Sequence, residues 1–172
     1  MPTPPPILCF AGSSGAGKTT LLVGVIRELR ARGFRVATAK HDPHGHAELD
    51  TEGKDTWWHS SAGAQTVVLV GPRRIACVSD EEEEPSLAAV RDRFAGSADI
   101  LLAEGFKRAP HPKIEVARGA LGADLVLRGD PHLVAVATDF ETGAGVPRLD
   151  LNEPAAVADF VEMGFLRPRT VP

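Results

Sequence analysis

Short apolar runs alternate with segments of helical period along the 172-residue chain. Apolar residues recur at steps of three and four from Leu21 to Leu29, which predicts a helix that begins near Thr19 and ends at Gly33. Further helices are predicted over residues 55–64, over 87–94 after the cap Ser86, and over 152–163 with Asn152 as the cap. The predicted strands cover residues 7–10, 34–39, 66–70, 75–78, 99–103, 114–116, 125–127 and 133–137.

This alternation of strands and helices predicts an α/β fold with a mostly parallel sheet and helices on both faces. Residues 71–74 predict a hairpin that would add a mixed portion to the sheet. We expect one domain over residues 1–172, in which the proline-rich residues 1–6 form an extended leader.

Composition narrows the class of protein. A hydrophobic content of 43% argues against a disordered chain, and no apolar run is long enough to span a bilayer. The net charge of −4 argues against broad nucleic-acid binding. The N-terminus lacks the pattern of a secretory signal, and Cys9 and Cys77 lie in apolar runs, so we expect a cytoplasmic protein with two buried thiols.

The most specific motif is GSSGAGKT, which follows the first predicted strand and opens the first helix. It fits the P-loop pattern without a mismatch. Glycines let backbone N–H groups turn toward an anion, and the helix directs its positive end at the same point. Lys18 would contact the β- and γ-phosphates, and the Thr19 hydroxyl would bind Mg²⁺. The predicted phosphate-binding residues are Gly12, Ser13, Ser14, Gly15, Ala16, Gly17, Lys18, Thr19 and Thr20.

Acidic residues at two strand ends complete this prediction. Glu104 follows the apolar run of residues 100–103 and is the candidate carboxylate for Mg²⁺ or its water, whereas Asp99 lies at the opposite end of that run. Thr138 and Asp139 follow the last apolar strand. A carboxylate there can accept two hydrogen bonds from guanine, although aspartate after a strand is also a common turn residue.

The segment from Lys40 to Gln65 is polar and rich in histidine. A segment of this length between strands is more often functional than idle. His41, His44 and His46 suggest a transition-metal site, but their spacing is not a firm ligand pattern. Contact with phosphate, with Mg²⁺-bound water or with a partner is the preferred interpretation.

These motifs together resemble the MobB family, the GTP-binding adapter proteins of molybdopterin guanine dinucleotide synthesis. The resemblance extends from about Ile7 to Val161. It rests on GSSGAGKTTLL, on KHDPHGH followed by LDTEGKDTWWHSSAGA, on LLAEGFK followed by PKIEVAR, and on LVAVATD.

The resemblance implies a P-loop NTPase-like domain that binds GTP and Mg²⁺, hydrolyses GTP weakly and forms a homodimer. It also implies work beside MobA, the guanylyltransferase that joins GMP to molybdopterin, and delivery of the cofactor to apo-molybdoenzymes. Carried over by position, Gly12 to Thr20 would hold the triphosphate, Glu104 would serve the metal, and Thr138 and Asp139 would meet guanine. The polar segment of the family matches Lys40, His41, Asp50, Gly53, Lys54 and Asp55.

Two alternatives remain open at this point, a small-molecule kinase and a metal-insertion GTPase that uses the histidine-rich loop. No Gln or Arg stands in an obvious place to orient water or to act as an arginine finger, which agrees with slow hydrolysis. Four basic residues after Glu104 could face an anionic pterin phosphate or a partner: Lys107, Arg108, Lys113 and Arg118.

Overall fold

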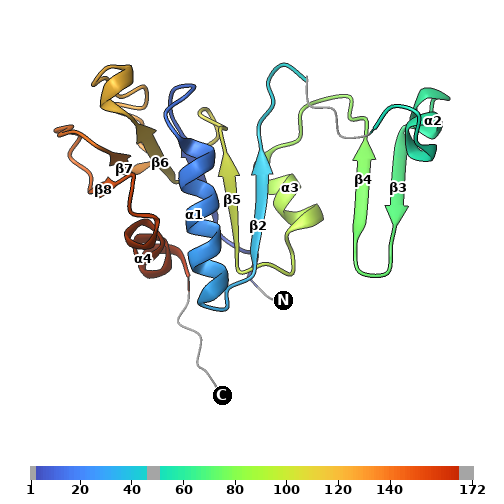
Figure 1. Cartoon of the computed structure of the whole chain (residues 1–172), viewed down its shortest axis with the longest axis horizontal. Helices are drawn as coiled ribbons and strands as arrows, with labels where there is room; N and C mark the ends of the chain where they lie inside the picture. Colours follow the sequence, from blue (N-terminus) through green and yellow to red (C-terminus); the bar gives the residue numbers. More distant parts are fainter. Residues whose placement is uncertain (1–2, 46–50, 167–172) are drawn as a thin grey trace. The chain divides into compact units, whose positions relative to one another are not determined.

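The computed structural model describes residues 3–45 and 51–166 (Figure 1). The chain divides into two compact units, one made of residues 1–41 and 86–172 and the other of residues 42–85. We call them the sheet unit and the hairpin unit and describe each by itself.

The sheet unit is built on six parallel strands. In chain order they are β1 (Ile7–Ala11), β2 (Val36–Lys40), β5 (Ile100–Glu104), β6 (Lys113–Ala117), β7 (Leu133–Thr138) and β8 (Arg148–Asp150). Their order in the sheet is β2-β5-β1-β6-β7-β8, and every neighbouring pair runs parallel. The predicted α/β fold is therefore confirmed, with β1 in the interior of the sheet.

Each face of the sheet has its own cover. Helices α1 (Lys18–Ala31) and α4 (Pro154–Phe165) pack on the face that contains Leu8 and Phe10. The opposite face contains Ile7 and Cys9 and is covered by α3 (Leu87–Phe94), with residues 125–127 beside it. Ser86 caps α3 as predicted, since its hydroxyl accepts the Ala89 N–H. Among the described residues, no helix combines the length and the apolar character needed to cross a membrane.

The hairpin unit consists of α2 (Asp55–Ser61) and the antiparallel strands β3 (Thr66–Val70) and β4 (Ile75–Ser79). The hairpin itself is confirmed, but it forms a separate two-stranded sheet instead of a mixed portion of the main one. The expected burial is confirmed for Cys9 and wrong for Cys77, which is exposed on β4. An apolar run alone does not distinguish a hairpin strand with an exposed face from a core strand.

Three details of the sheet unit differ from the sequence prediction. Residues 125–127 form no strand; the Glu115 carboxylate accepts the Val126 and Leu127 N–H groups at 2.6 and 3.0 Å and holds this segment over the sheet. The N-cap of α4 is Glu153 rather than Asn152. The short edge strand β8 was not predicted, because its three residues carry too little apolar pattern.

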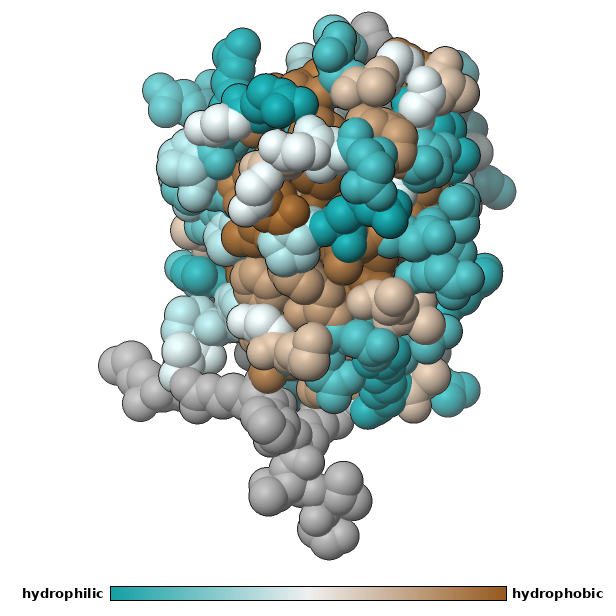
Figure 2. Space-filling model, turned by 90° about the vertical axis from the view of Figure 1, so that its left-hand side faces the viewer, coloured by the Kyte–Doolittle hydropathy of each residue, from teal (hydrophilic) through white to brown (hydrophobic). Residues whose placement is uncertain are grey.

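Figure 2 shows the side of the molecule that lies at the left of Figure 1. Hydrophobic residues gather in the middle of this view and hydrophilic residues surround them. Two apolar side chains of the segment after β6, Leu121 and Val126, are about half exposed, at 54% and 49%.

Gly12 joins β1 to the loop that follows and fits tightly against the neighbouring strand. Its φ angle is +145°, a value that favours glycine, and an added Cβ atom would overlap the Val116 carbonyl oxygen. Backbone cannot move aside as a flexible side chain can. The end of β1 therefore depends on the lack of a side chain at this position.

Replacing Gly12 with Ala should lower the free energy of unfolding by about 2–5 kcal/mol, because a backbone clash adds to a strained φ angle. Gly96→Ala is the matched control, since Gly96 has open space around its Cα, and we expect a change within about 0.5 kcal/mol. Guanidinium denaturation of both variants without nucleotide measures the difference. Equal midpoints for the two variants would contradict this interpretation.

Candidate functional site

The loop from Gly12 to Lys18, which we call the glycine loop, connects β1 to α1 at the carboxyl edge of the sheet. Gly15 and Gly17 adopt φ angles of +76° and +94°, which side chains disfavour. In the described structure no side chain caps α1, and its first turn holds no acidic residue. The first N–H groups of the helix are thus open to an external acceptor, and the helix dipole favours an anion there.

Lys18 lies folded across this loop. Its ammonium donates to the carbonyl oxygen of Ser13 at 2.7 Å and to that of Gly12 at 3.4 Å. Burial lowers the pKa of Lys18; the nearby Lys107 and Lys40 charges lower it further, whereas Glu104 raises it. The cation is partly desolvated and lies between attraction from Glu104 and repulsion from Lys107 and Lys40, so an incoming anion would be a favourable partner for it.

Thr19 and Glu104 meet at the same edge. The Thr19 hydroxyl donates to Oε1 of Glu104 at 2.7 Å. Glu104 ends β5 and pairs in register with Phe10 of β1, which explains why a residue 85 positions away lies beside the loop. Mg²⁺ prefers oxygen ligands such as hydroxyl and carboxylate groups. Thr19 and Glu104 place one of each side by side, so the pair fits that ion.

The end of β2 adds two more of the predicted residues. Lys40 pairs in register with Glu104, and the His41 N–H donates to the Glu104 carbonyl oxygen at 3.0 Å. The His41 ring stacks on Phe106 with centroids 4.9 Å apart. The structure thus brings Lys40, His41 and Glu104 together, with Lys107 close enough to affect the pKa of Lys18.

Other residues of the predicted polar segment lie in the hairpin unit or outside the described residues. Lys54 and Asp55 are exposed at the start of α2, in the hairpin unit. Asp50 and His46 lie outside the described residues. Within residues 3–45 and 51–166, no group of three His, Cys, Asp or Glu side chains could hold a metal ion, and the histidine-metal alternative gains no support there.

Thr138 and Asp139 lie at the end of β7, as expected. Thr138 is fully buried, and its hydroxyl accepts the Phe140 N–H at 3.4 Å. Oδ1 of Asp139 accepts the Gly119 N–H at 2.7 Å, and Oδ2 lies 3.8 Å from Nη1 of Arg118. Both carboxylate oxygens already have partners, so the contact of these residues with a base stays a prediction.

The expected contact role of Lys113 does not agree with the structure. Its side chain is 1% exposed, and its ammonium lies 3.2 Å from Oδ2 of Asp130 under the segment that follows β6. A buried lysine that is already paired cannot reach an external ligand without losing that partner. Lys113 therefore anchors the segment before β7, whereas Lys107 is exposed.

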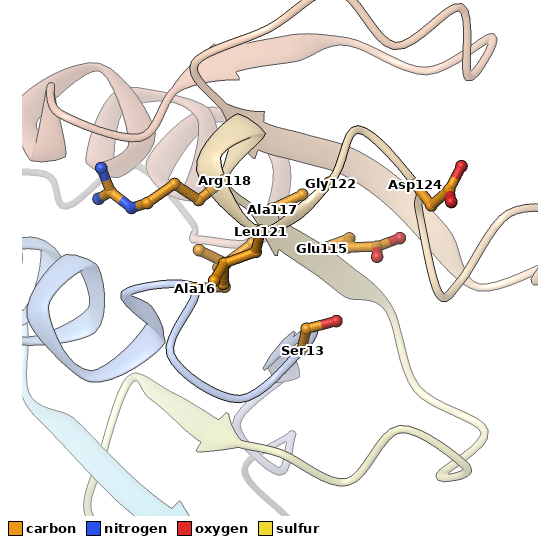
Figure 3. Close-up of a pocket in the computed structure, with 9 residues that line it drawn as sticks. Ser13, Ala16, Glu115, Ala117, Arg118, Leu121, Gly122 and Asp124 are labelled. Atoms are coloured by element: carbon orange, nitrogen blue, oxygen red, sulfur yellow. The ribbon is translucent and has the colours of Figure 1, made fainter.

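A pocket lies between the glycine loop and the segment after β6 (Figure 3). Ser13 and Ala16 line it from the loop, Glu115 from β6, and Leu121 and Asp124 from the following segment. Arg118 stands at its rim and directs its guanidinium away from Asp124. A Cβ atom on Gly17 would lie 3.3 Å from Nη2 of Arg118, so this arginine is a neighbour of the loop.

The sequence did not predict that Arg118 lies beside the glycine loop. Arg118 was grouped only with the basic residues after Glu104. The available signal was its position directly after a buried strand. Neighbouring parallel strands end at the same edge, and Ala11 of β1 pairs with Glu115 of β6, so the residues that follow both strands lie near the glycine loop.

The strand order and the glycine loop between β1 and α1 define the fold of the P-loop NTPases. Residues 7–139 match the sequence model of the family described as "Molybdopterin guanine dinucleotide synthesis protein B". The chain belongs to this family, MobB, and the predicted resemblance is confirmed.

Two curated relatives cover nearly the whole chain. The molybdopterin-guanine dinucleotide biosynthesis adapter protein of Haemophilus influenzae is 38% identical over 158 residues, which are 91% of this chain and 88% of that protein. The Escherichia coli K12 protein of the same name is 38% identical over 162 residues, 91% of each chain.

Solved structures agree on the fold. The crystal structure of a molybdopterin-guanine biosynthesis protein B has a TM-score of 0.75 and 27% identity, and the match covers 91% of this chain and 98% of that one. Bacillus subtilis MobB has a TM-score of 0.76 at 24% identity, over 95% and 99% of the two chains, and supports the fold alone.

Proposed function

We propose that this protein is a GTP-binding adapter of molybdopterin guanine dinucleotide biosynthesis. The observation that carries the proposal is the meeting of three features at one sheet edge: an uncapped α1 N-terminus, the Lys18 ammonium, and the Thr19–Glu104 pair. Together they offer N–H donors, a cation and metal ligands to one polyphosphate. The adapter role is supported by the names of the relatives from H. influenzae and E. coli.

The proposed contacts divide among the residues of the loop. Backbone N–H groups from Gly12 to Thr20 bind the phosphates, and Lys18 exchanges its bond to the Ser13 carbonyl oxygen for a phosphate oxygen. Thr19 and Glu104 hold Mg²⁺, which neutralises phosphate charge when bound. The exposed Lys40 and Lys107 increase the positive potential around the phosphates.

Guanine would be recognised at the end of β7. Asp139 directly follows β7, the neighbour of β6 in the sheet, and is exposed. A carboxylate there pairs with the N1–H and N2–H₂ donors of guanine, which adenine does not present on that edge. When Asp139 binds guanine, its Oδ2 oxygen loses the ion pair with Arg118.

Hydrolysis is proposed to be slow. The sequence contains one glutamine, Gln65, and it precedes β3 instead of following a strand of the main sheet. Glutamine is a residue that P-loop GTPases use to orient the attacking water. Binding of GTP with slow hydrolysis is a property expected of an accessory protein and not of a fast enzyme.

The proposed partners are the MobA-type guanylyltransferase, molybdopterin and apo-molybdoenzymes, and the protein is proposed to act as a homodimer. Four apolar side chains of the hairpin support a protein contact, since they are 50–72% exposed: Val68, Leu69, Val70 and Ile75. An isolated two-stranded sheet is marginally stable in water, so burial against a second copy would stabilise it.

Calorimetric titration with GTP and ATP in the presence of Mg²⁺ tests the ligand. We expect GTP to bind at least about 100-fold more tightly, because adenine would leave the carboxylate unpaired. Lys18→Ala should weaken GTP binding by about 100-fold, whereas Arg27→Ala, which removes an exposed charge from the same helix, should leave it unchanged. Preference for ATP, or wild-type affinity in Lys18→Ala, would contradict the proposal.

Size-exclusion chromatography with light scattering tests the adapter role. The protein alone should elute at the mass of two copies. With purified guanylyltransferase it should form a complex whose yield rises with GTP and Mg²⁺ and does not rise in Lys18→Ala. Separate elution of the two proteins under every nucleotide condition would argue against the role.

A further inference from the structure

Arg118 lies on the opposite side of the glycine loop from the other cations. It follows β6, whereas Lys40 and Glu104 end β2 and β5. The sheet order β2-β5-β1-β6 therefore puts β1 and its loop between these two groups. An anion held in the loop beside Lys18 would have the Lys40 and Lys107 charges on one side and Arg118 on the other.

The segment after β6 runs along the loop at close range. Nη2 of Arg118 lies 3.3 Å from the position of a Cβ atom on Gly17, and Cδ1 of Leu121 lies 3.8 Å from the position of one on Gly15. In Figure 3 the Arg118 side chain extends away from the pocket and from the Asp124 carboxylate. Its guanidinium is thus beside Gly17, the residue from which α1 starts.

The present partner of Arg118 holds it only loosely. Nη1 lies 3.8 Å from Oδ2 of Asp139, beyond the 2.7–2.9 Å range of a charge-assisted hydrogen bond. The two side chains are 37% and 33% exposed, and ion pairs exposed to this degree contribute little free energy. The carboxylate itself is fixed by the Gly119 N–H at 2.7 Å, so the guanidinium is the group that can move.

A phosphate is the better partner for this guanidinium. It offers two oxygens to the planar fork of N–H donors and carries more charge than a carboxylate. The movement required is short, because Arg118 already lies next to the loop. Exchange of partners would also release Oδ2 of Asp139, the residue proposed to meet guanine.

We propose that Arg118 is a phosphate-binding residue of the nucleotide site, which leaves Asp139 and pairs with the phosphate chain when nucleotide enters the glycine loop. This inference rests on the proposed function. It adds a second cationic side chain, from β6, to the lysine supplied by the loop itself.

Calorimetry with two probes, GTP and inorganic tripolyphosphate, tests this role in the presence of Mg²⁺. Arg118→Ala should weaken the binding of both probes by about 10- to 100-fold, the loss expected for one charged hydrogen-bonding group. Arg118→Lys keeps the positive charge but lacks the planar guanidinium, so its affinity should fall less than that of Arg118→Ala. The lysine variant replaces the alanine variant in this test if the alanine variant does not fold. Arg148→Ala, whose partner Glu141 is exposed, removes an arginine on β8 and should change neither affinity.

Tripolyphosphate has no base, so it separates contact with the phosphates from recognition of guanine by Asp139. Unchanged tripolyphosphate affinity in Arg118→Ala would overturn the inference, even if GTP affinity fell. Failure of the proposed function would look different: the wild-type protein would bind no GTP, or Lys18→Ala would bind it as well as the wild type does.

Discussion

The close approach of β1 to β6 at Gly12 is the constraint on which the rest of the site depends. Because Gly12 carries no side chain, β1 can end against the Val116 carbonyl and turn directly into the loop before α1. The strands next to β1 are parallel and end at the same edge, so residues from distant parts of the sequence gather around that turn. Glu104 arrives from β5, Lys40 from β2 beyond it, and Arg118 from β6. This backbone contact thus holds the turn around which the residues of the site gather.

Electrostatics give this edge its chemical character. The helix N-terminus, the half-buried Lys18 and its lysine neighbours are all positive, and the hydrogen bonds of Lys18 to loop carbonyl oxygens are a poor substitute for an anion. The Glu104 carboxylate is the negative group among these positive charges. Its contact with Thr19 is the place where a divalent cation would bind beside the phosphates. The other acidic groups serve the scaffold. Glu115 and Asp130 hold the segment after β6, and this segment in turn places Arg118.

The sequence predicted those parts of the protein whose chemistry is local. The glycine loop, its strand and its helix are encoded in one continuous motif, and Glu104 follows an apolar run that could only be a strand end. What depends on distant neighbours was missed. Lys113 was predicted to contact an external phosphate or a partner, yet Lys113 and Glu115 are both buried on β6. Asp130 pairs with the Lys113 ammonium, and the Glu115 carboxylate accepts two backbone N–H groups. Residues 125–127 have a strand-like pattern but form no strand. The Val126 and Leu127 N–H groups donate to the Glu115 carboxylate instead of to a neighbouring strand. The exposure of Cys77 depends on what covers a hairpin, which an apolar run does not specify.

The most direct test is a crystal structure of the full-length protein with a nonhydrolysable GTP analogue and Mg²⁺. We predict the triphosphate in the glycine loop, with the Lys18 ammonium moved from the Ser13 carbonyl to a phosphate oxygen and the metal bound by Thr19 with Glu104 beside it. Electron density for the analogue elsewhere, with Lys18 still bonded to Ser13 and the Thr19–Glu104 contact unchanged, would contradict the central claim.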